Sequence, residues 1–317
     1  MGSVAPATLI SFPATSEKLF GRNVGRLASM PDLEDAVPER DKDLARRTLA
    51  DLLATLQIDP DPALGRFVVP RVNGPGTPHF ERDLTTLMHA APDRFHGVVV
   101  PKLQDAAEVE RVLALVRGEA DRLGWRTLPW VVALIETVRG IENLAAICDV
   151  LAGHGSGGVL CGHLDLASDA RLVVTDAVER HRELRAWTKL VARTAKSRGL
   201  GAIDGPFPRL APAPGADAEL VLTTGWSLVD GYDGRLVIHP SQVEPVRDVM
   251  VPSPDTTRES ARILRLTLAH GGAFRDESTG EMIDNAVRRS HWTLVERALA
   301  NGVIGADEVV GLEPPPL

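Results

Sequence analysis

The stretch LPWVVALIETVRG (Leu128–Gly140), followed by a helical pattern and then by GGVLCGHLD (Gly157–Asp165), decides the fold. Each quoted part holds an apolar run without alternation, which is typical of a strand buried on both faces of a parallel sheet. Glu136 closes the first run and Asp165 follows the second. Since neighbouring parallel strands end at the same edge, the two carboxylates can converge on one hard cation such as magnesium. On the pattern alone, they could instead cap helices or pair with an arginine.

The composition is that of an ordinary globular chain. Its 317 residues are 44% hydrophobic and 25% charged, enough for one large domain with an extension, or for two. The net charge of −8 and the pI of about 5.6 exclude nucleic acid and an anionic membrane as main partners, because both require a dense basic face. No signal-peptide pattern or membrane-spanning run is present, so we expect a cytoplasmic protein. Cys148 and Cys161 fit a reducing compartment and are expected to be small core residues.

Apolar runs and helical patterns alternate along the first 250 residues. This alternation predicts a (β/α)8 TIM barrel over residues 1–250, because eight strands with their helices need about 240 residues. The predicted strands cover 7–13, a short segment before Asp32, 66–73, 97–102, 128–136, 157–162, 201–205 and 234–239. The predicted helices cover 17–27, 39–56, 77–90, 105–123, 138–151, 177–198 and 217–231.

Residues 251–317 are predicted to form a separate C-terminal helical extension. Two helices are expected, at 256–269 and 286–301, and Gly271 and Gly272 provide a flexible joint between them. A glycine-hinged appendage of this kind often covers an active site, so we interpret it as a lid. The alternative is a surface helix pair.

Polar side chains stand where the predicted strands end. In a TIM barrel these positions share one mouth, where active sites are built. We expect His239 to fix the barrel mouth as a structural residue rather than to bind a metal. The strand-end residues are Asp32, Arg71, Lys102, Glu136, Asp165, Asp204 and His239.

Ordered motifs over nearly the whole chain resemble the citrate lyase beta-subunit-like family, within the HpcH/HpaI aldolase and malyl-CoA lyase group. The C-terminal GEMID (Gly280–Asp284) resembles the lid motif of its acyl-CoA lyase members. The other motifs are DLEDAV (32–37) with Lys42, Ala45 and Arg46, RVN (71–73), PK (101–102), IETVRG (135–140), Gly162 with Asp165, AIDGP (202–206) and DGRLVIHPSQ (233–242).

This resemblance implies a magnesium-dependent carbon–carbon lyase on a TIM barrel, assembled as a homotrimer. It implies that Glu136 and Asp165 bind Mg²⁺ and that Arg71 holds the oxygens of a 2-oxo acid and the developing enolate. Asp284 would act as the acid/base, reaching the site from the lid of a neighbouring subunit. Further implied roles are the orientation of metal-bound waters by Glu34 and Asp35, and substrate binding by Lys102 and by the segment Gly162, His163 and Leu164.

Two departures from the family pattern concern the ligand. Ala7 replaces an arginine expected just before the first strand, where relatives use basic residues for coenzyme A phosphates; Lys18 and Arg22, with Arg26, are candidates to replace it. His163 stands where a small residue is usual, and it either alters which keto acid fits or serves as a capping or solvated histidine.

The expected function is cleavage or formation of a malyl-, citramalyl- or citryl-type 3-hydroxyacyl-CoA, giving a 2-oxo acid and a short acyl-CoA. One alternative is an aldolase of the same family that does not use coenzyme A, within a specialised biosynthetic pathway. A second is a malyl-CoA thioesterase, and a third is a non-catalytic binding subunit. The sequence does not decide among the acyl groups or the direction of the reaction.

Overall fold

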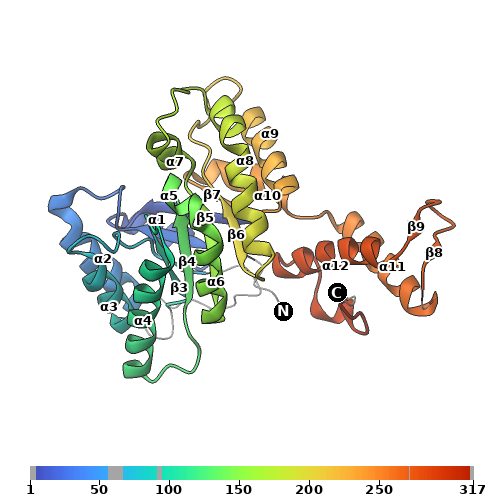
Figure 1. The fold of residues 1–317 in the computed structure, drawn as a ribbon, viewed down its shortest axis with the longest axis horizontal. Helices are drawn as coiled ribbons and strands as arrows, with labels where there is room; N and C mark the ends of the chain where they lie inside the picture. The colour runs from blue at the N-terminus through green and yellow to red at the C-terminus, as the bar shows by residue number, and fades with distance from the viewer. Residues whose placement is uncertain (1–4, 56–66, 91–94, 271, 315–317) are drawn as a thin grey trace. The chain divides into compact units, whose positions relative to one another are not determined.

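A computed structural model describes residues 5–55, 67–90, 95–270 and 272–314 (Figure 1). The chain divides into two compact units, one reaching Met250 and the other beginning at Val251. Three predicted positions, Leu56 at a helix end, Arg66 at a strand start and Gly271 in the joint, lie outside the described residues.

The first unit is a parallel barrel. Its seven-stranded sheet has the order β2-β1-β7-β6-β5-β4-β3, and every pair of neighbours runs parallel. Parallel strands without alternation are buried on both faces, as the apolar runs predict. The strands are β1 (Thr8–Pro13), β2 (Ser29–Asp32), β3 (Gly97–Val100), β4 (Trp130–Ile135), β5 (Gly157–Cys161), β6 (Gly201–Asp204) and β7 (Gly234–Val237).

The third predicted strand differs from a regular strand. Residues 67–72 lie between β2 and β3 and make only isolated bridges to them, although Val69 N–H donates to Ser29 O at 2.9 Å and Val99 N–H donates to Pro70 O at 2.9 Å. Pro70 has no N–H to donate, so the ladder is interrupted there. The segment nevertheless occupies the eighth place between the two edge strands and brings Arg71 beside Asp32.

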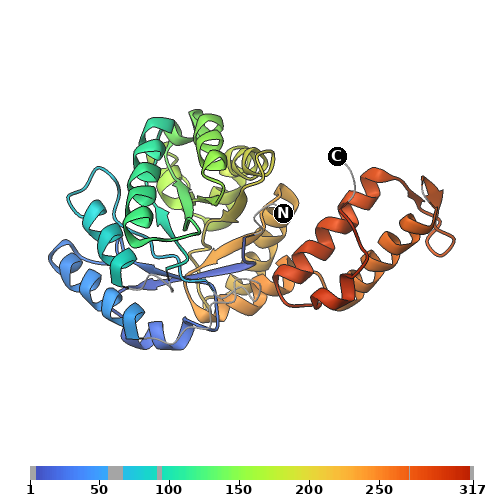
Figure 2. The ribbon, with the colours of Figure 1, turned by 90° about the horizontal axis from the view of Figure 1, so that it is seen from below.

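Helices surround the strands, as Figure 2 shows from below. The short helices α5, α7 and α10 were not predicted as separate elements, and α3 begins three residues later than expected because Thr77 forms a turn with Gly74. The helices are α1 (Glu17–Asn23), α2 (Lys42–Thr55), α3 (Phe80–Ala90), α4 (Ala106–Leu123), α5 (Val138–Glu142), α6 (Leu144–His154), α7 (His163–Asp169), α8 (Ala177–Lys196), α9 (Ala216–Asp230) and α10 (Val243–Met250), with short 3₁₀ turns η1 (Glu39–Asp41) and η3 (Pro240–Gln242).

Large aliphatic side chains fill the centre of the barrel, and nearly every strand contributes at least one. Their burial closes the interior below the carboxyl ends of the strands, so the polar residues gather above it. The central cluster includes Leu9, Met30, Val69, Val99, Val132, Leu134, Leu160, Ile203 and Leu236.

The second unit pairs two helices. α11 (Pro254–His270) packs on α12 (Asn285–Ala300), and between them β8 (Phe274–Arg275) and β9 (Met282–Ile283) form a small antiparallel hairpin, followed later by η4 (Ala306–Val309). Asp276 anchors the hairpin loop by accepting hydrogen bonds from Arg262 and Ser278. Among the described residues, no helix is long and apolar enough to cross a membrane.

Candidate active site

A cavity of about 150 Å³ opens at the carboxyl ends of the strands. Its floor consists of apolar side chains from the barrel interior, and acids and an arginine stand around it. The lining residues are Ser11, Met30, Asp35, Arg71, Leu134, Glu136, Leu160, Cys161, Gly162, His163, Leu164, Asp165, Pro206, Leu236 and Ile238.

Glu136 is the buried acid of this cavity. It directly follows β4, and its Oε1 accepts a hydrogen bond from the Lys102 backbone N–H at 3.0 Å. Burial raises the pKa of Glu136 to about 8, and repulsion from Asp165 and Glu34 adds to the effect. A Cβ at Gly162 would lie 2.8 Å from Glu136 Oε2, so glycine is needed at position 162. The cavity therefore disfavours the negative charge of Glu136 unless a cation binds beside it.

The second acid, Asp165, lies in the first turn of α7, after β5. Its side chain is exposed and lines the same cavity as Glu136. Gly162 precedes α7, and its N–H donates to Ile135 O at 2.9 Å, which ties the start of α7 to the end of β4. The structure thus brings together the two acids that the opening stretch places after adjacent strands.

Arg71 is surrounded by acids. Its Nε and Nη2 donate to the two oxygens of Asp32 at 2.8 and 2.6 Å, in a bidentate arrangement. Its Nη1 contacts Glu34 Oε2 at 2.8 Å and Asp35 Oδ2 at 3.2 Å. Burial by itself would lower the pKa of Arg71, but the hydrogen bonds that it donates to Asp32 and the negative charge of Asp32 raise it. Arg71 is therefore a permanently charged fork beside the cavity, held by Asp32.

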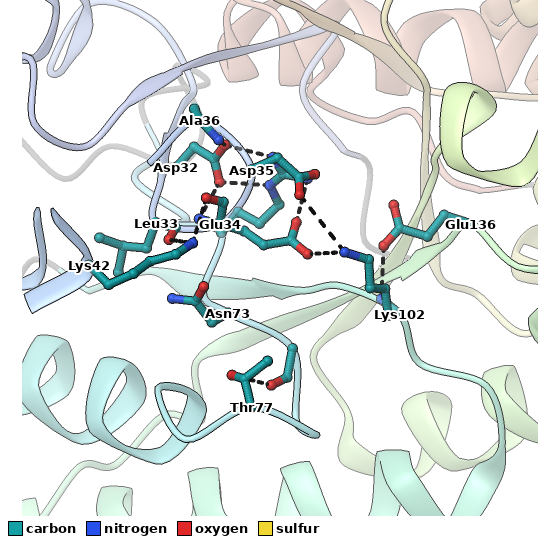
Figure 3. A network of polar contacts seen from close by, with 12 residues as sticks. Asp32, Leu33, Glu34, Asp35, Ala36, Lys42, Asn73, Thr77, Lys102 and Glu136 are labelled. Atoms are coloured by element: carbon teal, nitrogen blue, oxygen red, sulfur yellow. Dashed lines mark hydrogen bonds and ion pairs between the residues drawn. The ribbon is translucent and has the colours of Figure 1, made fainter. Parts of the chain in front are cut away.

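Lys102 connects this acidic cluster to Glu136 (Figure 3). Its Nζ donates to Glu34 Oε1 at 2.7 Å and lies 3.9 Å from Asp35 Oδ1. The residue has a φ of 58°, a left-handed conformation in which its own N–H points at Glu136. Burial raises the pKa of Glu34, whereas Arg71 and Lys102 lower it.

Lys42 supports the same cluster from below. It is buried on α2, and its Nζ donates to Leu33 O at 2.8 Å and to Glu34 O at 2.6 Å (Figure 3). The motif pointed to this lysine, but its role as an anchor for the Leu33–Glu34 backbone could not be derived from the pattern.

The remaining predicted residues are not among those that line the cavity. Lys18 and Arg22 are exposed on α1, which follows β1. Asp284 belongs to the second unit, where its Oδ1 accepts the N–H groups of Ala286 and Val287 and caps α12. His239 caps η3, since its Nδ1 accepts from the Ser241 N–H at 3.2 Å. The expected roles of Lys18 and Arg22 in binding and of Asp284 in catalysis remain predictions, and so does the structural role of His239 at the barrel mouth.

Asp204 does not face the cavity, although it ends β6. It is fully buried, its Oδ1 pairs with His163 Nε2 at 2.7 Å, and Ser227 donates its hydroxyl to the other oxygen. His163 is thus neither solvated nor a cap. The two cysteines are buried thiols, and burial raises the pKa of both Cys148 and Cys161, which makes them poor nucleophiles.

The residues present fit a divalent cation. Glu136 and Asp165 repel each other across the cavity, and Arg71 and Lys102 are already paired with Asp32 and Glu34. A hard cation between the two carboxylates would relieve that repulsion with oxygen ligands and leave room for water and substrate. This donor set, free of sulfur and imidazole, suits magnesium.

A closed parallel barrel with charged groups gathered at the carboxyl ends of its strands defines the class as a TIM-barrel enzyme. Residues 28–240 match the family described as HpcH/HpaI aldolase/citrate lyase, and the chain belongs to this family of lyases. The resemblance inferred from the motifs is thereby confirmed, and so is the barrel.

Several relatives are similar over most of their length. The (3S)-malyl-CoA thioesterase of Cereibacter sphaeroides is 30% identical over 254 residues, 78% of each chain. The L-malyl-CoA/beta-methylmalyl-CoA lyase of Rhodobacter capsulatus is 25% identical, covering 84% of this chain and 86% of that one. The structure of CitE from Mycobacterium tuberculosis with magnesium, acetoacetate and coenzyme A aligns with a TM-score of 0.69 and 26% identity over 94% of this chain and 99% of that one.

Proposed function

We propose that this protein is a magnesium-dependent carbon–carbon lyase that cleaves, or in reverse forms, a 3-hydroxyacyl-CoA of the malyl, citramalyl or citryl type. The products of cleavage are a 2-oxo acid and a short acyl-CoA. The observation that carries the proposal is the pair Glu136 and Asp165, which line one cavity at the ends of adjacent strands. Magnesium bound there would act as a Lewis acid on the oxygens of the 2-oxo acid.

The reaction requires a proton to leave the substrate hydroxyl and a carbon–carbon bond to break. The electron pair of that bond moves onto the thioester carbonyl as an enolate, which is then protonated at carbon. Arg71 keeps a permanent positive charge beside the cavity, and such a charge stabilises the enolate oxygen. Asp32 holds the guanidinium in place, so no reorganisation is needed when the negative charge develops.

Other residues of the cavity position the substrate. We assign the carboxylate of the 2-oxo acid to the backbone around Gly162, His163 and Leu164, and the orientation of metal-bound waters to Glu34 and Asp35. Asp284 is proposed as the acid/base that exchanges the hydroxyl proton, supplied from a neighbouring subunit. A homotrimer in the cytoplasm is part of this proposal.

The position of Ala7 removes one objection to the use of coenzyme A. This residue immediately precedes β1, whereas the cavity lies at the carboxyl ends of the strands. The six residues of β1 span about 20 Å, so the missing arginine would have stood at the opposite end of the barrel. Its absence is therefore no argument against a thioester at the mouth, where Lys18 and Arg22 on α1 are candidates for the phosphates.

The test is a product analysis. The purified protein with magnesium is incubated with malyl-, citramalyl- and citryl-CoA, and acyl-CoA and 2-oxo acid are separated by chromatography. We expect both products in equal amounts, and we expect Glu136→Gln to abolish them. Absence of cleavage and of the reverse condensation across the panel would refute the proposal.

A thioesterase acting on malyl-CoA is the second candidate, and the 30% identity with the Cereibacter sphaeroides enzyme favours it. The same chromatograms separate the two, because a thioesterase releases free coenzyme A and an intact hydroxy acid. Water would then attack the thioester carbonyl, and no 2-oxo acid would appear.

A further inference from the structure

A second, smaller cavity lies beside the main one. Its volume is about 10 Å³, which is enough for a single oxygen atom of a water or a ligand. His163, Leu164 and Pro206 line both cavities, so the two meet just beyond the carboxyl ends of β5 and β6. We call this smaller cavity the side pocket.

The side pocket has a positive lining. Among the described residues it is bordered by two arginines, Arg180 and Arg235, by two histidines, His163 and His181, and by no acid. The other lining residues are Leu164, Ala177, Pro206, Phe207 and Pro208. A cavity of this kind favours a negatively charged or electron-rich group.

Arg235 brings an unused donor to the side pocket. The residue is completely buried; its Nε donates to Gly205 O at 3.0 Å, and its Nη1 donates to Thr223 and Thr224 hydroxyls at 2.8 and 3.0 Å. Nη2 has no partner among the described residues. A buried guanidinium nitrogen without an acceptor is costly, so an acceptor oxygen is expected next to it.

His181 provides a second unused polar atom. It lies on α8, is 3% exposed, and its Nδ1 has no partner among the described residues. Burial lowers the pKa of His181 to about 3, so the ring is neutral and can present an N–H without adding a buried charge. Two residues that line the side pocket thus each carry an orphaned polar atom.

A metal ion does not account for these atoms. Ligand atoms of His163, His181 and Asp204 lie within 4.8 Å of one another, a spacing that a metal can use. Both oxygens of Asp204 are already engaged, by His163 and by Ser227, and the charge of the buried Arg235 offsets that of Asp204. With that pair neutral, Arg180 is the remaining positive group of the lining, so a divalent cation would add to its charge, whereas an anionic oxygen would offset it.

We propose that the side pocket binds one oxygen of a second carboxylate on the substrate, so that the enzyme prefers a 2-oxo acid that carries two carboxylates. This inference rests on the proposed function and selects its citryl-type substrate, whose cleavage releases such an acid. The first carboxylate and the oxo group stay in the main cavity, and the second carboxylate reaches past His163 and Leu164 toward Arg235.

The test compares two 2-oxo acids of nearly equal shape. Oxaloacetate, freshly dissolved, and 4-methyl-2-oxopentanoate differ in having a carboxylate or an uncharged isopropyl group at the far end. Each is titrated by calorimetry into the magnesium-loaded full-length protein. We expect oxaloacetate to bind about tenfold more tightly, the effect of one charge-assisted hydrogen bond.

Variants locate the preference. Arg235→Lys keeps the charge but removes Nη2, and His181→Leu removes the second donor. Arg180→Gln removes the charge at the rim. Each variant should reduce the preference for oxaloacetate over 4-methyl-2-oxopentanoate to about threefold or less. If Arg235→Lys fails to fold, the other two decide. His154→Leu is the matched control, because His154 is also a buried histidine with an unpartnered Nδ1 but is absent from both cavity linings. His154→Leu should prefer oxaloacetate to the same degree as the wild type.

The outcomes separate the two proposals. Equal affinities of the wild type for both acids would overturn the side-pocket assignment, leave water as the occupant, and keep the lyase proposal. A preference for oxaloacetate that persists in all three variants would also overturn it. Binding of neither acid in the presence of magnesium would overturn both the lyase proposal and the assignment.

Discussion

At the residue scale, Glu136 links metal binding to pH. Its folded-state pKa of about 8 lies above the ordinary value of 4.5, so the stability associated with its neutral form is complete below pH 4.5 and is lost as the pH rises through 8. Metal-free wild type should therefore lose stability relative to Glu136→Gln over this range, whereas magnesium should stabilise the wild type increasingly toward pH 8. The measurement is thermal denaturation of both proteins across this pH range, once with a chelator and once with magnesium. If the stability of the two metal-free proteins changed with pH in the same way, the prediction would be contradicted.

Arg71 provides a second prediction at the same scale. Arg71→Lys keeps the charge but loses the bidentate pair of hydrogen bonds to Asp32, so the buried carboxylate of Asp32 is left short of hydrogen-bond donors. The free energy of unfolding should fall by about 2 kcal/mol. Denaturant titration of the metal-free protein measures it. Arg258→Lys, in an exposed pair with Asp255, is the control and should change stability by about 0.5 kcal/mol or less; equal losses in the two variants would be unexpected.

At the element scale, strand pairing depends on close backbone approach. A Cβ at Gly234 would lie 1.8 Å from Pro6 O, so Gly234→Ala must separate β7 from the start of β1. We expect a loss of about 3 kcal/mol or more, or an insoluble protein. Gly225→Ala, in the middle of α9 with open space around it, should instead add up to about 1 kcal/mol. The two variants are compared by their yield of soluble protein and by thermal denaturation. If Gly234→Ala left the stability unchanged, β1 and β7 would not need this contact.

At the scale of the whole molecule, Asp284 tests whether two subunits build one site. Asn is as good a helix cap as Asp, so Asp284→Asn should keep α12 stable. If Asp284 is the acid/base, as proposed, the same change should lower kcat about a hundredfold or more. If Asp284 acts across subunits, mixed oligomers of Asp284→Asn and Glu136→Gln should regain activity, because one site then holds both native residues. Mixtures no more active than the separate variants would place Asp284 within its own subunit or outside the reaction.

Much of this arrangement followed from the sequence by itself. Apolar runs without alternation predict parallel strands. The acids that follow β4 and β5 were expected near each other because parallel strands end at the same edge. The motifs identified the family from the same residues. These inferences depend on local patterns and on one general rule of barrel geometry.

Only the tertiary structure decided which strand-end residues share the cavity. Asp204 and Glu136 look alike in sequence, yet Asp204 turns outward to His163 and Ser227, while Glu136 lines the mouth. The engagement of Arg71 by Asp32 and the orphaned Nη2 of Arg235 likewise involve partners distant in the chain. The physical reason is that side-chain direction and hydrogen-bond satisfaction depend on neighbours brought together by the barrel, and no short stretch of sequence contains them.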